Sequence, residues 1–156
     1  MTMDRRQVLL LAAGMTGAAA AASDAASPAN PESPTEKVLG IGGLFFRASD
    51  PKALAHWYLD NLGISLMPTG HGDVPWHTEA GVTVFAPFPQ KTTYFAPTQP
   101  WMINFRVRDL DKMAAQLRAK GIEVDVDATA YPHGRFAHLH DPEGNPIELW
   151  QPADRG

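Results

Sequence analysis

Phe46-Arg47-Ala48-Ser49-Asp50 and Phe105-Arg106-Val107-Arg108-Asp109 are two copies of one pattern, 59 positions apart in the chain. In each copy a β-rich run leads into the motif, the aspartate is placed to cap a helix, and the helical stretch ends at a Gly-Ile pair. Those pairs are Gly63-Ile64 and Gly121-Ile122. Because the same order of cap, helix, Gly-Ile and hairpin recurs, we interpret the chain as a duplication in which each half has the order β-α-β-β-β.

The second half gives the clearest prediction of its elements. Apolar residues recur at helical spacing after Asp109, at Leu110, Met113, Ala114 and Leu117. A hairpin turn is predicted at Asp141-Pro142-Glu143-Gly144-Asn145, and its counterpart in the first half at Glu79-Ala80-Gly81. The duplicated halves are therefore expected over about 38–90 and 100–152.

Residues 1–34 carry the pattern of an export signal. The pair Arg5-Arg6 precedes an uncharged run from Val8 to Ala22, which is followed by a Pro/Ser-rich stretch. This run has 15 residues, fewer than the roughly 20 of a spanning helix. The pair resembles a twin-arginine motif, although Asp4 precedes it. We expect a periplasmic or secreted protein with no membrane span after cleavage; an ordinary secretory signal and an uncleaved anchor are the alternatives.

The amino-acid composition excludes several kinds of binding partner and reactive group. The chain has 156 residues, a formal net charge of −4 and no cysteine. This length predicts a single domain, over 35–156 once the signal is set aside. The acidic balance and the lack of a basic stripe argue against nucleic-acid binding. Without cysteine there is no disulfide, thiolate nucleophile or Cys-ligated metal.

The stretch Asp141-Pro142-Glu143-Gly144-Asn145-Pro146-Ile147-Glu148-Leu149, together with the duplicated plan, resembles the vicinal oxygen chelate superfamily. Glyoxalase I, bleomycin-resistance proteins, fosfomycin-resistance enzymes and extradiol dioxygenases belong to that superfamily. The resemblance covers about 38–152. It implies an α+β fold in which two tandem βαβββ modules form a curved mixed sheet around a cavity. It also implies a small-molecule ligand, and members of the superfamily can exchange modules in a homodimer.

Strand alternation predicts which side chains face away from the helices. Ile103, Phe105 and Val107 form the apolar set of their strand and are expected to pack beneath the helices. The five-residue turn pairs His140 with Pro146, His138 with Glu148 and Phe136 with Trp150. The opposite face then gathers Asn104, Arg106, Phe136, His138, His140, Glu148 and Trp150. This face is either the wet side of a half-buried sheet or, if the resemblance holds, the wall of the cavity.

The metal site that the resemblance implies is incomplete in this sequence. The ligand positions of the metal-dependent members match Gly43, Met102, Glu148 and Thr83, or Phe85 if the register slips. One carboxylate does not hold a divalent ion, which needs three or more donors. We therefore expect no metal and no other cofactor. The alternative is a relocated site for Fe, Mn, Zn or Ni made by His138, His140 and Glu148.

These observations indicate two candidate functions, and a third interpretation also stays open. The first is metal-free binding of a small organic molecule, as in bleomycin-resistance proteins, with Asn104, Arg106, Phe136, His140 and Trp150 as ligand-binding residues. The second is a glyoxalase-like lyase or dioxygenase-related enzyme in which His138 and Glu148 are the catalytic pair, with or without a relocated metal. The third is a partner-binding module whose cavity has collapsed.

Overall fold

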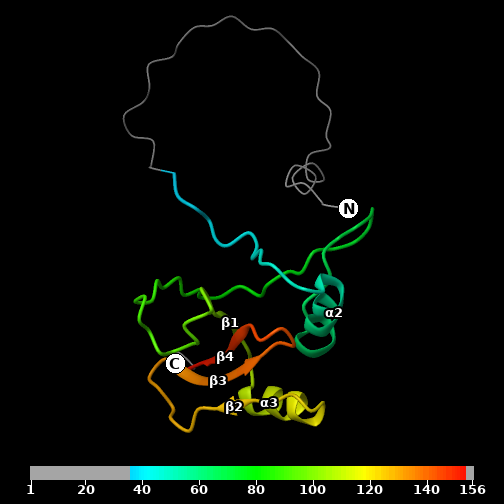
Figure 1. The fold of residues 1–156 in the computed structure, drawn as a ribbon. Helices are drawn as coiled ribbons and strands as arrows, with labels where there is room; N and C mark the ends of the chain where they lie inside the picture. The colour runs from blue at the N-terminus through cyan, green and yellow to red at the C-terminus, as the bar shows by residue number, and fades with distance from the viewer. Residues whose placement is uncertain (1–35, 154–156) are drawn as a thin grey trace, which may run out of the picture. The chain divides into compact units, whose positions relative to one another are not determined.

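The structure is a computed structural model that describes residues 36–153. The predicted export signal, 1–34, lies outside the described residues. In chain order the elements are α2 (Pro51–Leu62), β1 (Ile103–Arg106), α3 (Leu110–Ala119), β2 (Asp125–Val126), β3 (Gly134–His140) and β4 (Pro146–Pro152) (Figure 1). Within 36–153, none of the helices has the length and apolar character needed to cross a membrane.

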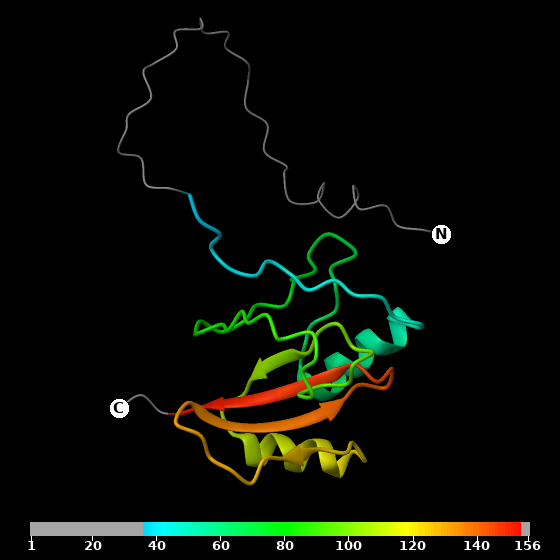
Figure 2. The ribbon, with the colours of Figure 1, turned by 60° about the vertical axis from the view of Figure 1, so that its left-hand side comes forward.

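The second half of the chain folds in the predicted β-α-β-β-β order. Its four strands form one sheet in the order β1-β4-β3-β2, in which β1 and β4 are parallel and the other pairs antiparallel. Figure 2 shows α3 lying along one face of this sheet. The α+β class with a mixed sheet is therefore confirmed, and the sheet is open rather than closed around a cavity.

The predicted register of the last hairpin is confirmed. His140 pairs with Pro146, His138 with Glu148 and Phe136 with Trp150. The turn that joins the strands closes through a hydrogen bond of 2.9 Å from the Gly144 amide to the Asp141 carbonyl. Because side chains alternate along a strand, this register sends His138 and Glu148 to the same face of the sheet.

The core lies between the helices and the apolar face of the sheet. Two residues of α2, Leu54 and Tyr58, join the predicted apolar positions of α3 and the inward residues of β3 and β4. Met113 and the three apolar residues predicted for the first strand pack against this cluster. The buried core consists of Leu54, Tyr58, Leu110, Ala114, Leu117, Val124, Ala137, Leu139, Ile147 and Leu149.

Both helices begin and end where the duplicated pattern predicts. The Asp50 carboxylate accepts from the Ala53 amide at 3.0 Å, and the Asp109 carboxylate accepts from the Lys112 amide at 2.9 Å. These side chains satisfy backbone N–H groups that have no partner within the helix. The α2 helix ends at Gly63, whose φ of 70° is the left-handed conformation that glycine adopts without strain.

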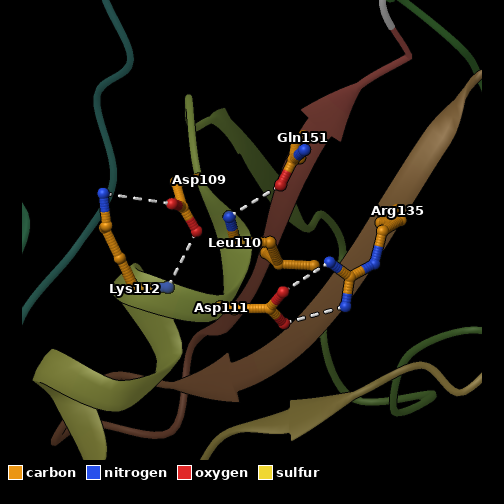
Figure 3. Close-up of polar contacts among 6 residues, drawn as sticks. All are labelled: Asp109, Leu110, Asp111, Lys112, Arg135 and Gln151. Atoms are coloured by element: carbon orange, nitrogen blue, oxygen red, sulfur yellow. Dashed lines mark hydrogen bonds and ion pairs between the residues drawn. The ribbon is translucent and has the colours of Figure 1, made fainter.

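Side chains from both strands of the final hairpin, which are paired at the end away from its turn, attach to the start of α3 (Figure 3). The guanidinium of Arg135 on β3 donates two hydrogen bonds of 2.8 Å to the Asp111 carboxylate. The side-chain oxygen of Gln151 on β4 accepts from the Leu110 amide at 2.8 Å. The helix is therefore tied to two neighbouring strands by its first turn, in addition to its apolar contacts.

The turn of the superfamily-like stretch ties the final hairpin to α2. The Asp141 carboxylate is buried, and it accepts from the Tyr58 hydroxyl at 2.9 Å and from the Asn145 side-chain amide at 2.7 Å. It also accepts from the Glu143 and Asn145 backbone amides, each at 2.9 Å. Burial, followed by the neighbouring Asp141 carboxylate, raises the pKa of Tyr58.

Glu143 in the same turn reaches the start of α2. Its carboxylate accepts from the Ser49 amide at 2.8 Å and from the Asp50 amide at 2.9 Å. An anion at this end of a helix also interacts favourably with the helix dipole. Residues about 90 positions apart are thereby joined, so this stretch of sequence holds the two halves of the fold together.

The first half of the chain differs from the expected pattern. It forms the predicted helix, but the described residues 44–50 and 63–100 contain no strand. Apolar side chains of the expected strands are exposed, including Phe45 and Phe85. Prolines such as Pro75 and Pro87 flank the expected hairpin, and proline has no N–H to donate to a sheet. The prediction of strands in the first half is therefore wrong, because these residues form no continuous ladder of backbone hydrogen bonds.

Candidate functional site

Glu148 is the centre of the polar face of the sheet. It lies on β4 and is 5% exposed. Its Oε1 accepts from the Asn104 side-chain amide at 2.5 Å, and its Oε2 accepts from the Tyr94 hydroxyl. The same oxygen lies 3.0 Å from Nε2 of His138. Both oxygens are therefore held by side chains, since a buried carboxylate is costly unless donors surround it.

The charges of this pair follow from its contacts. Burial is the largest influence on Glu148 and would raise its pKa, but the hydrogen bonds from His138, Tyr94 and Asn104 together outweigh burial and leave the pKa lowered. The hydrogen bond with Glu148 is the largest influence on the pKa of His138 and raises it, against the effect of burial. Glu148 is thus held ionised, and His138 is favoured in its protonated form.

Asp125 and Asp127 add negative charge around the imidazole. Asp125 is the cross-strand partner of His138 on β2, and both carboxylates further raise the pKa of His138. The His138 side chain remains 33% accessible to solvent. The pair is therefore a buried anion covered by a partly exposed imidazole that an external molecule can reach.

Tyr94 is the site residue that the sequence did not indicate. It lies in a segment without helix or strand between α2 and β1, and its hydroxyl reaches Glu148 across 54 positions of sequence. Its ring meets the His138 ring edge-on, with centroids 5.5 Å apart. Partial burial and then the Glu148 carboxylate raise the pKa of Tyr94, so its hydroxyl keeps its proton. The segment has no periodic pattern, so nothing in the sequence singled this residue out.

An aromatic pair lies beside the polar pair on the same face. The rings of Phe136 and Trp150 are stacked, with centroids 6.2 Å apart and an interplanar angle of 5°. The Trp150 indole donates to the His133 carbonyl at 2.9 Å. Gly134, with φ of 136°, passes so close that a Cβ there would lie 2.6 Å from the indole nitrogen. The backbone approach at Gly134 and the indole hydrogen bond together fix the Trp150 ring.

Two other predicted ligand-binding residues, Arg106 and His140, lie farther from Glu148. The Arg106 guanidinium donates to the carbonyls of Glu79 and Ala80, at 2.6 and 3.2 Å. Its charge is therefore used to hold the first-half turn against β1. His140 is exposed at the hairpin end of β3, opposite Pro146.

The metal site implied by the resemblance does not fit the residues present. At the matching positions Gly43 has no side chain, Met102 offers only a soft thioether, and Glu148 already accepts from three side chains. Among residues 36–153, no group of three or more His, Asp or Glu side chains is placed to hold a metal ion. In particular, His140 is not grouped with His138 and Glu148.

We expect the purified protein to carry well under one equivalent of divalent metal, because the donor set is incomplete. Chelator treatment should leave its melting temperature unchanged, since a metal that binds the folded state would raise it. Elemental analysis after loading with Fe, Mn, Zn or Ni, followed by thermal denaturation, checks both points. Stoichiometric metal that is lost in His138→Ala would instead establish the relocated site.

A shallow depression of about 380 Å³ lies at the turn after α3, lined by Arg118, Gly121, Ile122, Glu123 and Val124. The Arg118 guanidinium donates to the Val124 carbonyl at 2.7 Å. This arrangement stabilises the turn and brings no group of reactive side chains together. The chemistry is instead concentrated on the polar face around Glu148.

Comparison with known proteins identifies the fold family. The family model described as "Glyoxalase-like domain" matches residues 43–150. These residues include the superfamily-like stretch, both capped helices and all of the four-stranded sheet except the last two residues of β4. No curated protein matches the chain.

Several solved structures are similar to parts of the chain. A protein from Bacillus anthracis assigned to the glyoxalase family is 31% identical over 40% of this chain, with a TM-score of 0.32. The chain covers half of the length of that protein. TnmS3, described as an antibiotic binding protein from Streptomyces sp. CB03234, is 25% identical over 67% of this chain and 88% of its own, with a TM-score of 0.42. A glyoxalase/bleomycin resistance protein from the same organism is 26% identical over 67% and 93%, with a TM-score of 0.42.

Proposed function

Because the chain belongs to the glyoxalase-like domain family, we propose that it is an exported protein that binds a small organic molecule without a metal ion. The ligand lies on the polar face of the sheet, against Glu148, His138 and the stacked pair of Phe136 and Trp150. Its polar part meets the first two residues and its flat part meets the aromatic rings.

The observation that carries this proposal is the buried Glu148 carboxylate beside a stacked aromatic pair. A core of apolar side chains would be more stable without a buried charge, since desolvation is costly. Here an ionised carboxylate is kept with three side-chain donors, next to a partly exposed imidazole. A few placed polar groups next to aromatic surface are typical of ligand sites.

Fragment binding to metal-free protein tests the proposal. Planar aromatic fragments are titrated into chelator-treated protein, and binding is followed by ligand-observed NMR. Wild type should bind a subset of fragments, and Glu148→Gln should bind them about tenfold more weakly because charge-assisted hydrogen bonds are the stronger ones. Glu123→Gln, an exposed carboxylate on the turn after α3, is the matched control and should bind as wild type does. Absence of any binding, or equal binding by both variants, would contradict the proposal.

A second candidate function is proton-transfer catalysis, as in a lyase or dioxygenase-related enzyme. It is favoured by one observation, the orientation of the His138 ring by a buried carboxylate through Nε2. This contact leaves Nδ1 available to give or take a proton. A catalytic role requires that His138→Gln abolish turnover of a bound molecule while binding is kept; loss of binding alone would support the binding protein.

Export through the twin-arginine pathway is the localisation that we propose. Changing Arg5 and Arg6 to lysine should leave the precursor in the cytoplasm, because that pathway is addressed by the arginine pair. Cell fractionation of the variant and of wild type measures the effect. Partial inhibition of the Sec pathway is the control and should leave wild-type export intact. Normal export of the Lys-Lys variant would contradict the proposal.

A further inference from the structure

Tyr94 makes the set of contacts that a bound phenol would make. Its hydroxyl donates to Oε2 of Glu148. Its ring lies edge-on to His138 at 5.5 Å and is stacked on Phe88, with centroids 5.5 Å apart and an interplanar angle of 22°. A planar ring, a hydroxyl donor and a buried carboxylate acceptor are therefore already combined at the site.

Tyr94 is held there by few other contacts. It is 48% exposed and stands outside the buried core cluster. Its segment is free of helix and strand, and the Tyr94 amide bonds only locally, to the Thr92 hydroxyl at 3.2 Å. Moving this ring away breaks no sheet hydrogen bond and opens no cavity in the core. In Figure 2 the segment between α2 and β1 lies on the side of the sheet opposite α3, so it covers the polar face.

The side chains that would remain around the site without Tyr94 determine which ligand group can replace its hydroxyl. Asn104 holds Oε1 of Glu148, and His138 contacts Oε2. Without Tyr94, Oε2 of Glu148 would keep a free acceptor position in a mostly buried environment, and an unpaired buried acceptor is unfavourable. An incoming group must therefore donate a hydrogen. A carboxylate or phosphate in that position would meet the ionised Glu148 and be repelled.

We infer that Tyr94 is an internal occupant of the site, and that the ligand is a planar aromatic molecule whose hydroxyl displaces the Tyr94 hydroxyl from Glu148. This inference rests on the proposed binding function and names its ligand class. Because the closed arrangement competes with the ligand, the apparent affinity is reduced by the fraction of molecules in which Tyr94 is seated.

The test compares 2-naphthol with 2-methoxynaphthalene, which keeps the ring and the oxygen but has no hydrogen to donate. Both probes are titrated calorimetrically into the full chain, in wild type, Tyr94→Phe and Thr93→Ala. Wild type should bind 2-naphthol about tenfold more tightly than the methoxy compound. Tyr94→Phe keeps the ring and loses the competing hydroxyl, so its affinity for 2-naphthol should rise by about tenfold. Thr93→Ala, an exposed neighbour in the same segment, controls for loosening of the chain and should match wild type.

The outcomes separate this inference from the proposed function. Equal affinity for the two probes would overturn the donor requirement while small-molecule binding stands. Unchanged or weaker binding of 2-naphthol by Tyr94→Phe would overturn the internal-occupant role. If neither probe bound to wild type or to any variant, the inference and the proposed function would both be overturned.

Discussion

Replacing Asp141 with alanine is expected to lower the free energy of unfolding by about 3 kcal/mol, because one buried donor and three partly buried donors lose their acceptor, and a buried donor left unpaired costs about 1–3 kcal/mol. The carboxylate accepts from the Tyr58 hydroxyl, the Glu143 amide, and both the backbone and side-chain amides of Asn145. All four lose their partner at once, and the turn that attaches the hairpin to α2 loses its acceptor. Urea denaturation at pH 7 measures the change.

Tyr58→Phe is the control for this prediction. It removes one donor and leaves the carboxylate with its other three, so we expect a loss of about 1 kcal/mol. If Asp141→Ala were no more destabilising than Tyr58→Phe, the carboxylate would not be what holds the turn, and the explanation of the superfamily-like stretch would be wrong.

Glu148→Gln is expected to give the second large effect, a loss of about 2 kcal/mol in the free energy of unfolding near pH 6, because charge-assisted hydrogen bonds are replaced by neutral ones. The size of this loss should depend on pH. The raised pKa of His138 makes its contribution full below the unfolded histidine value of about 6.5, and the contribution is lost as pH rises through the folded pKa.

The lowered pKa of Glu148 sets the lower pH limit of this stabilising contribution. Its contribution is present above the unfolded glutamate value of about 4.3 and is lost as pH falls through the folded pKa. The difference between wild type and Glu148→Gln should therefore be largest between about pH 4.5 and 6.5. Urea denaturation across this range measures it, with Glu123→Gln as control. A difference that stays constant with pH would show that the charge of Glu148 contributes nothing.

Local signals made the second half of the fold predictable from sequence. The capping aspartates, the helical spacing after Asp109 and the five-residue turn each act over a few residues, and the structure has all three. The register of β3 and β4 followed from turn length and alternation alone, which is why the His138–Glu148 pair could be named in advance.

The features that were missed depend on contacts between distant residues. The expected strands of the first half need partners that the described residues do not supply, and alternation in sequence cannot reveal a missing partner. The attachment of Glu143 to the start of α2 and of Tyr94 to Glu148 spans 94 and 54 positions. Side chains in loops reach such partners only through the folded arrangement, so no spacing rule predicts them.

An NMR titration of the His138 imidazole in wild type and in Glu148→Gln directly tests whether an ionised Glu148 is paired with His138. We expect a pKa above the usual histidine value in wild type, because the ionised Glu148 stabilises the imidazolium. In Glu148→Gln the pKa should fall, since the neutral amide no longer favours the charged ring. Identical titration curves in the two proteins would contradict the pairing of His138 with an ionised Glu148, and with it the site built around that carboxylate.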